Sequence, residues 1–276
     1  MVKIVTDTGS GLSLDEMKAW GVAGMPGIYV MFGDESYRET WDISNDAFHA
    51  KLKSDPRFPT TSGATFDDFM KVYEPIKNDG IVSIHLSKKL SVTVDSARVA
   101  AKELGTDIAV IDTQFINIAQ ALYVREALRM ANAGASVAEI KTHIEGLIPR
   151  TRLYILFETL ENLRRGGRIG AAAALLGGVL QAKPILSLKD GALVPVERVR
   201  TMPKALARLK EIALEDLKKS AAPMIGFMHS HAPEGVAAFA RDVCAELNYK
   251  DPLILEAGAA VAAHAGPGAI GIAYIL

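Results

Sequence analysis

The chain has 276 residues and a formal net charge of -1, which excludes a strong bulk attraction to nucleic acid or to an anionic membrane. Its one cysteine, Cys244, excludes an internal disulfide and a cysteine-based zinc site. The first residues have the pattern of a buried strand rather than a signal peptide, and the longer apolar stretches are too short or too interrupted to span a bilayer. We therefore expect a cytoplasmic protein without stable membrane insertion.

Short apolar runs alternate with helical patterns in the first half of the chain. The sequence predicts strands over residues 2–6, 27–32, 80–86 and 107–112. It predicts helices over residues 14–20, 66–78, 90–104 and 118–133. Ser13 and Glu16 have the spacing of a capping box at the start of the first of these helices. Alternation of this kind predicts a parallel sheet with helices on both faces.

The second half has a different pattern. The sequence predicts strands over residues 153–158, 185–188, 192–199, 224–229, 259–263 and 272–276, and helices over residues 137–147, 203–220 and 233–248. Asp190-Gly191 predicts a hairpin between two of the strands. The predicted fold is therefore α/β, with a parallel-sheet N-terminal domain over residues 1–149 and a mixed-sheet C-terminal domain over residues 150–276.

Two clusters of hydroxyl side chains precede helical patterns in the N-terminal half. One contains Thr61 and Ser62, and the other contains Ser91 and Thr93. Hydroxyls and free backbone N–H groups at a helix start form an anion site. N-capping alone would explain either cluster equally well. Two clusters at the carboxyl ends of strands favour ligand binding, because ligands bind in crevices there.

Arginines and paired histidines are the other polar groups of interest. The loop 163–169 carries three arginines and two adjacent glycines, which favour an anion or partner contact. Arg200 follows the strand predicted over residues 192–199. His229 and His231 have a spacing found in metal sites, but no carboxylate motif accompanies them, so a structural or solvent-facing role is favoured. No metal and no cofactor is expected.

His264 precedes a glycine-rich turn at residues 266–271 and is expected at the end of an apolar strand. The formal G-x-G-x-x-G there does not indicate a dinucleotide site, because Pro267 occupies its second position and no helical pattern follows. A hydrolase using Thr61 or Ser91 with His264 as base, and Asp7 or Asp112 to orient the histidine, fits the residue types. No G-x-S-x-G elbow supports it, so hydrolysis is the less favoured alternative.

Several motifs together resemble one family. The His-Ala-Gly-Pro-Gly segment at residues 264–268 resembles the C-terminal H-x-G-P-G signature of the DegV family, whose better-described members are the fatty acid-binding subunits of bacterial fatty acid kinase. Similar matches occur at residues 7–10, 59–62, 86–97, 163–169, 183–186, 190–191 and 200–201. The resemblance runs from Val2 to Leu276.

The resemblance implies two α/β domains and one long-chain fatty acid in a buried apolar tunnel. Its carboxylate would be presented to the catalytic subunit of a fatty acid kinase, which forms an acyl-phosphate for phospholipid synthesis. The protein itself would not be an enzyme. By position, the carboxylate would be bound by Thr61, Ser62, Ser91, Thr93 and His264, without a buried cation. Arg168 and Arg200 would face the kinase, and residues 169–182 and 257–263 would line the tunnel.

Three departures from the family pattern are expected near the carboxylate site. Val92 replaces a glycine, Gly63-Ala64 replaces Q-P, and residues 117–121 replace an S-x-G-x-G segment. Val92 would either narrow the pocket or fill space between helix and sheet. A carrier of another apolar carboxylate therefore remains an alternative beside the hydrolase.

Overall fold

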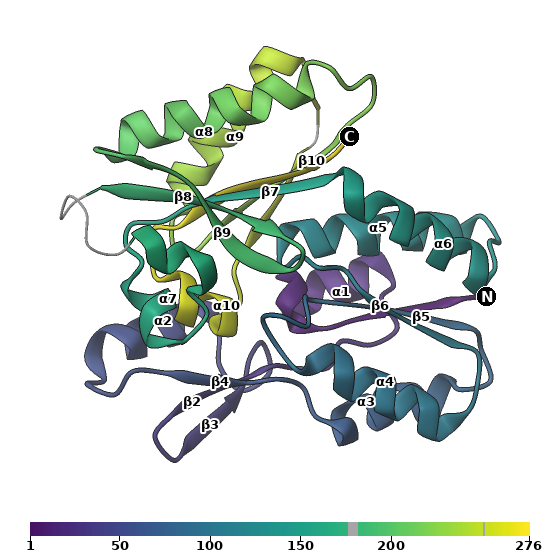
Figure 1. The fold of residues 1–276 in the computed structure, drawn as a ribbon. Helices are drawn as coiled ribbons and strands as arrows, with labels where there is room; N and C mark the ends of the chain where they lie inside the picture. The colour runs from purple at the N-terminus through teal and green to yellow at the C-terminus, as the bar shows by residue number, and fades with distance from the viewer. Residues whose placement is uncertain (176–181, 251) are drawn as a thin grey trace.

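Two helix-covered sheets organise the fold (Figure 1), and the computed structural model describes residues 1–175, 182–250 and 252–276. The first sheet is parallel, in the order β1-β5-β6. Its strands are β1 (Lys3–Thr6), β5 (Ile81–His85) and β6 (Ile108–Asp112). Helices α3 (Phe66–Tyr73) and α4 (Thr93–Leu104) lie on one side of it, and α5 (Ile118–Asn132) and α6 (Val137–Leu147) on the other.

The second sheet has six strands in the order β11-β10-β12-β7-β8-β9. They are β7 (Thr151–Leu156), β8 (Lys183–Lys189), β9 (Ala192–Val199), β10 (Met224–His229), β11 (Leu253–Glu256) and β12 (Ile270–Ile275). Only β10 and β11 pair in parallel; the other pairs are antiparallel. Helices α8 (Met202–Leu217) and α9 (Pro233–Leu247) cover one face. The predicted fold class, with a parallel first sheet and a mixed second sheet, is confirmed.

A third, antiparallel sheet has the order β3-β2-β4. It contains β2 (Tyr29–Phe32), β3 (Glu35–Arg38) and β4 (Thr60–Ser62), with α2 (Asn45–Ser54) between the last two in the chain. The expectation that residues 27–32 join the parallel sheet is wrong. Gly33, with φ of 62°, allows a tight turn after β2, so the chain folds back as a hairpin.

Residues 259–263, expected as a strand, belong to helix α10 (Ala259–Ala265). Alanine has the strongest intrinsic preference for helix, and five of the seven residues of α10 are alanine. Gly266 ends the helix with φ of 72°, a conformation that disfavours other residues. His264 therefore lies in the last turn of a helix and not on a strand.

Two shorter helices complete the described structure. Helix α1 (Leu14–Trp20) begins with the predicted capping box of Ser13 and Glu16, which is confirmed. Helix α7 (Glu161–Arg165) includes the start of the segment that we expected as a loop from residue 163. Short 3-10 turns lie at Thr8–Ser10, Glu74–Ile76, Ile148–Arg150 and Gly170–Leu175.

The two halves of the chain share one hydrophobic core cluster. It contains Ile84 and Leu122 from the first half and Ile155 and Ala273 from the second. The domain division at residue 149 therefore stays a prediction, although all six strands of the second sheet come from Thr151–Ile275. No helix in the described ranges combines the length and apolarity needed to cross a bilayer.

Candidate functional site

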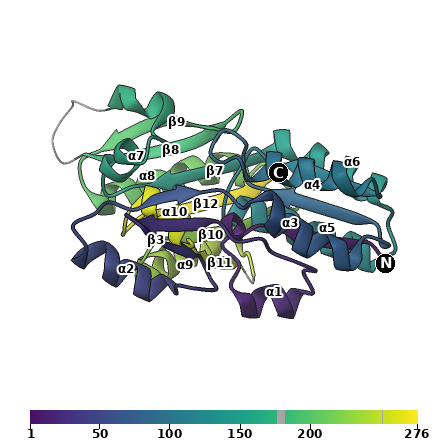
Figure 2. The same cartoon turned by 90° about the horizontal axis from the view of Figure 1, so that it is seen from below.

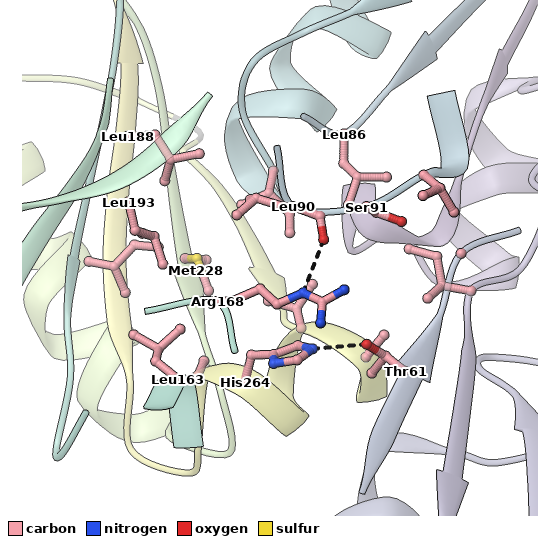
Figure 3. Close-up of a pocket in the computed structure, with 18 of the residues that line it drawn as sticks. Thr61, Leu86, Leu90, Ser91, Leu163, Arg168, Leu188, Leu193, Met228 and His264 are labelled. Carbon is pink, nitrogen blue, oxygen red and sulfur yellow. Dashed lines mark hydrogen bonds between the residues drawn. The ribbon is translucent and has the colours of Figure 1, made fainter. Parts of the chain in front are cut away.

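A cavity lies where the third sheet and the start of α4 face α10 and the second sheet (Figure 3). Its lining is mainly apolar: Ile28, Leu86, Leu90, Val92, Ile116, Ile155, Phe157, Leu163, Leu188, Leu193, Met228, Ala260, Val261 and Ala265. The polar side chains in the lining are Thr61, Ser62, Ser91, Arg168 and His264. In the close-up, Leu188, Leu193 and Met228 lie toward the second sheet, whereas Thr61 and Ser91 lie on the opposite side.

Thr61 and His264 form the central polar pair of the cavity. Thr61 Oγ1 lies 2.9 Å from His264 Nε2, so β4 and α10 meet through this hydrogen bond. His264 Nδ1 is buried and has no hydrogen-bond partner among the described residues. Burial, together with the positive charge of Arg168, lowers the pKa of His264 to about 4. The imidazole is therefore neutral near pH 7.

The first glycine after α7 makes room for this histidine. A Cβ atom at Gly166 would lie 2.1 Å from His264 Nδ1, far inside van der Waals contact. The loop after α7 can therefore approach α10 closely only with glycine at position 166.

Arg168 extends into the cavity beside His264 (Figure 3). Its Nε donates to the carbonyl oxygen of Leu90 at 3.3 Å, and its Nη1 donates to that of Gly166 at 3.0 Å. We expected Arg168 to face a partner and the cavity to lack a buried cation. The half-buried guanidinium is instead part of the cavity wall, because the turn at Gly166-Gly167 directs it back toward α4. A half-buried cation therefore lies in the cavity wall, where the expectation was of a carboxylate site without a buried one, and the partner-facing role of Arg168 stays a prediction.

Ser91 and Thr93 have different roles. Ser91 lines the cavity, and its hydroxyl lies 2.8 Å from that of Thr93. Thr93 is fully buried, lies outside the lining and accepts a hydrogen bond from the amide of Ala64. A Cβ atom at Gly63 would lie 2.8 Å from Thr93 Oγ1 and 2.9 Å from Ser91 Oγ. Gly63 thus allows the end of β4 to pack on the start of α4, with Thr93 joining them.

Of the three departures from the family pattern, Val92 and Gly63 line the cavity, whereas residues 117–121 do not. Val92 lines the cavity, and the residue is 63% exposed, so the interpretation that it fills space between helix and sheet is wrong. Residues 117–121 begin α5 and are not among the residues that line the cavity, contrary to expectation. Gln120 from this segment instead donates to Thr6 and Asp7 in the core below the first sheet.

Neither Asp7 nor Asp112, the acids expected to orient His264 in a hydrolase, is paired with it. Asp7 Oδ2 lies 2.8 Å from His85 Nδ1, and Asp112 accepts from the amides of Lys88 and Gln114. Both proposed orienting acids therefore have other partners. A buried chain of contacts does join Asp7, His85 and Ser83, with 2.6 Å between Ser83 Oγ and His85 Nε2. All three side chains are fully buried, so no substrate reaches them.

Two further expectations concern residues outside the cavity. Arg200 is exposed after β9 and does not contribute to the lining. Of the stretch 169–182, residues 176–181 lie outside the described residues, and the described ones do not line the cavity. The apolar lining comes from strands of the second sheet, from residues 28, 86, 90 and 116, and from α10, where Ala260 and Val261 of the expected stretch 257–263 line the cavity. Sequence reasoning missed the positions outside α10 because they have the same pattern as core strand residues.

Comparisons with known proteins agree over the whole chain. The model of the DegV family, described as a family of uncharacterised proteins, matches residues 1–276. A DegV domain-containing protein of Streptomyces coelicolor is 40% identical over 278 residues, covering 98% of this chain and 97% of the relative. The protein DegV of Bacillus subtilis is 30% identical over 277 residues, covering 99% and 98%.

Solved structures show the same fold. The structure of a DegV family protein from Thermus thermophilus, described as fatty acid binding, has a TM-score of 0.93 and 32% identity over 99% of each chain. The structure of DegV from Bacillus subtilis, described as a fatty acid binding protein, has a TM-score of 0.91 and 28% identity over 100% of this chain and 99% of that one. The motifs, the fold and the full-length matches lead to one conclusion: the chain belongs to the DegV family.

Proposed function

We propose that the protein binds a long-chain fatty acid in the cavity between the second and third sheets. The observation that carries this proposal is an apolar cavity whose few polar side chains are three hydroxyls, a neutral imidazole and a guanidinium. Apolar walls with a few convergent polar groups are typical of sites for small amphipathic ligands. The relatives from Thermus thermophilus and Bacillus subtilis that are described as fatty acid binding support the same ligand class.

The ligand carboxylate would accept hydrogen bonds from Thr61 and Ser91 and face the charge of Arg168, and His264 would orient the Thr61 hydroxyl toward it. If His264 carries its proton on Nε2, it donates to Thr61 Oγ1, and the Thr61 hydroxyl is free to donate to the carboxylate. The other tautomer would bury an Nδ1–H without an acceptor, which is costly. The Nε2–H tautomer therefore fits both the neighbours and the ligand.

The acyl chain would extend from this polar group toward Leu188, Leu193 and Met228 (Figure 3). Each buried methylene contributes about 0.8 kcal/mol, so the chain supplies most of the binding free energy and the polar groups fix its orientation. Ser62 and Thr93 would act indirectly: Ser62 is exposed at the rim, and Thr93 holds Ser91 in place.

We further propose that the protein has no catalytic activity of its own and presents the carboxylate to a fatty acid kinase subunit in the cytoplasm. The rim formed by exposed Val92 and Ser62 is where such a partner would reach the carboxylate, with Arg200 as a separate contact. A hydrolase is disfavoured because, among the described residues, no acid is hydrogen-bonded to His264 Nδ1. A carrier of another apolar carboxylate would use the same groups.

Native mass spectrometry of the purified protein, followed by organic extraction, tests the ligand. We expect one bound acid per chain, with about 14 to 20 carbons. Recovery of a different apolar carboxylate would support the second carrier function. Protein that is empty and takes up no long-chain acid would contradict both.

A further inference from the structure

A second cluster of potential ligand groups lies outside the cavity, where α2 meets the ends of β10 and β11. His49 lies on α2, His231 follows β10 by two residues, and Glu256 is the last residue of β11. One ligand atom from each of the three lies within 4.8 Å of the others. Figure 2 shows α2 along the edge of the molecule, and α2 packs against α10.

His49 is the buried member of this cluster. It is 7% exposed, and its Nε2 is buried without a hydrogen-bond partner among the described residues. A buried polar atom left unpaired costs on the order of 1–3 kcal/mol, so such an atom needs an explanation. The exposed ring of His231 stacks on His49 with 4.4 Å between centroids, and this stacking does not give the nitrogen a partner.

Two imidazoles and one carboxylate form a donor set suited to zinc, whereas calcium and magnesium prefer oxygen ligands alone. Zinc bonds of about 2.0–2.2 Å would bring the ligand atoms to roughly 3.5 Å from one another. The widest pair would therefore close by at most about 1.3 Å, a movement that the exposed His231 side chain can make. A neighbouring cavity of about 390 Å³, lined by both histidines, leaves ample room for a water as fourth ligand.

We propose that His49, His231 and Glu256 bind a zinc ion, with water in the fourth position. The ion would satisfy His49 Nε2 and join α2 to two strands of the second sheet. The expectation was of no metal and of a structural or solvent-facing role for His229 and His231; the proposed site takes only His231 of that pair. It does not depend on the proposed fatty acid function, because the three residues lie outside the apolar cavity.

The test is zinc binding to untagged, chelator-treated protein, measured by competition with a chromophoric chelator. We expect one site per chain and a zinc-dependent rise in Tm. Glu256→Gln preserves shape, and His231→Asn suits the positive φ of 51° at that position, so both variants should fold. Each should weaken zinc binding at least tenfold. The matched control is His143→Gln, since His143 is paired with Glu126 elsewhere on the surface.

Cobalt provides an independent spectroscopic measurement. Cobalt in a four-coordinate site should give strong visible absorption in the wild-type protein and in His143→Gln, and weak absorption in the other two variants. The proposal is overturned if the wild-type protein binds zinc no better than His231→Asn and Glu256→Gln, or if His143→Gln loses as much binding as they do.

Discussion

The carboxylate of Glu39 accepts a hydrogen bond from the backbone amide of Ala260 at 2.7 Å, across 221 positions of the chain. Ala260 lies in the first turn of α10, so this contact fixes the helix that carries His264. The other carboxylate oxygen accepts from the hydroxyl of Thr8. Burial outweighs these hydrogen bonds and raises the pKa of Glu39 to about 7.

This pKa predicts how stability depends on pH. Between pH 4.5, the ordinary pKa of the group, and about pH 7, the folded state holds a proton that the unfolded state has released. The contribution of Glu39 to stability is therefore present below that window and is lost as pH rises through it. Glu39→Gln should remove this component, which denaturant unfolding at a series of pH values measures. If the free energies of unfolding of the wild-type protein and Glu39→Gln change in parallel with pH, the prediction is contradicted.

Removing His264 should weaken fatty acid binding more than removing Thr61. His264 holds Thr61 in position and lies beside Arg168, whereas the loss of Thr61 leaves Ser91, His264 and Arg168 in place. A lost hydrogen bond to a charged group costs on the order of 1.5–3 kcal/mol, and we expect His264→Ala to reach that range. Titration with a fluorescent fatty acid compares it with Thr61→Ala, with exposed Thr106→Ala as the control. Equal losses for the two cavity variants would count against this order.

Substitution of Arg168 and of Arg200 should affect different steps: the first should weaken fatty acid binding, and the second should reduce acyl-phosphate formation. Arg168 lies in the cavity, so Arg168→Ala should reduce fatty acid affinity by about tenfold or more through loss of a charge-assisted contact. Arg200 is exposed outside it, so Arg200→Ala should leave affinity unchanged and reduce acyl-phosphate formation with a kinase subunit. Parallel binding and phosphorylation assays test both. Unchanged affinity in Arg168→Ala would return this residue to a partner-facing role alone.

A methyl group at position 166 should displace His264. Gly166→Ala would place Cβ at 2.1 Å from His264 Nδ1, so either the imidazole or the loop after α7 must move. We expect fatty acid affinity to fall about as far as in His264→Ala, with a protein that still folds. Gly146→Ala is the matched control, because a Cβ there meets nothing within 4 Å. Wild-type affinity in Gly166→Ala would show that the loop adapts without disturbing the histidine.

Local signals in the sequence were enough for most elements. The capping box predicted the start of α1, and Asp190-Gly191 predicted the hairpin of β8 and β9. The H-x-G-P-G motif singled out His264, which lines the cavity, although its helix was read as a strand. A short alanine-rich run fits a buried strand or a helix equally well. Glu39, whose carboxylate accepts from the first turn of this helix, lies far away in the sequence, so no local pattern could resolve the choice.

The third sheet and the cluster of His49, His231 and Glu256 could not be predicted from the sequence, for a related reason. The strand β3 is polar and β4 has only three residues, so neither has a strong strand pattern. The two-residue turn at Gly33 was the available signal for the hairpin. His49 gave no signal because its partners, His231 and Glu256, lie about 200 positions away. Contacts of that range become visible only when the sheets are assembled.

The strand order of the second sheet has a consequence for how the protein is made. β12 lies between β10 and β7, yet it is the last of the six strands to be synthesised. Until residues 270–275 have left the ribosome, β7 and β10 have no neighbour on their inner edges, and their unpaired backbone groups are exposed to other chains. Pairing of β12 with both strands covers these two edges at once, so the second sheet closes only when residues 270–275 are available to it.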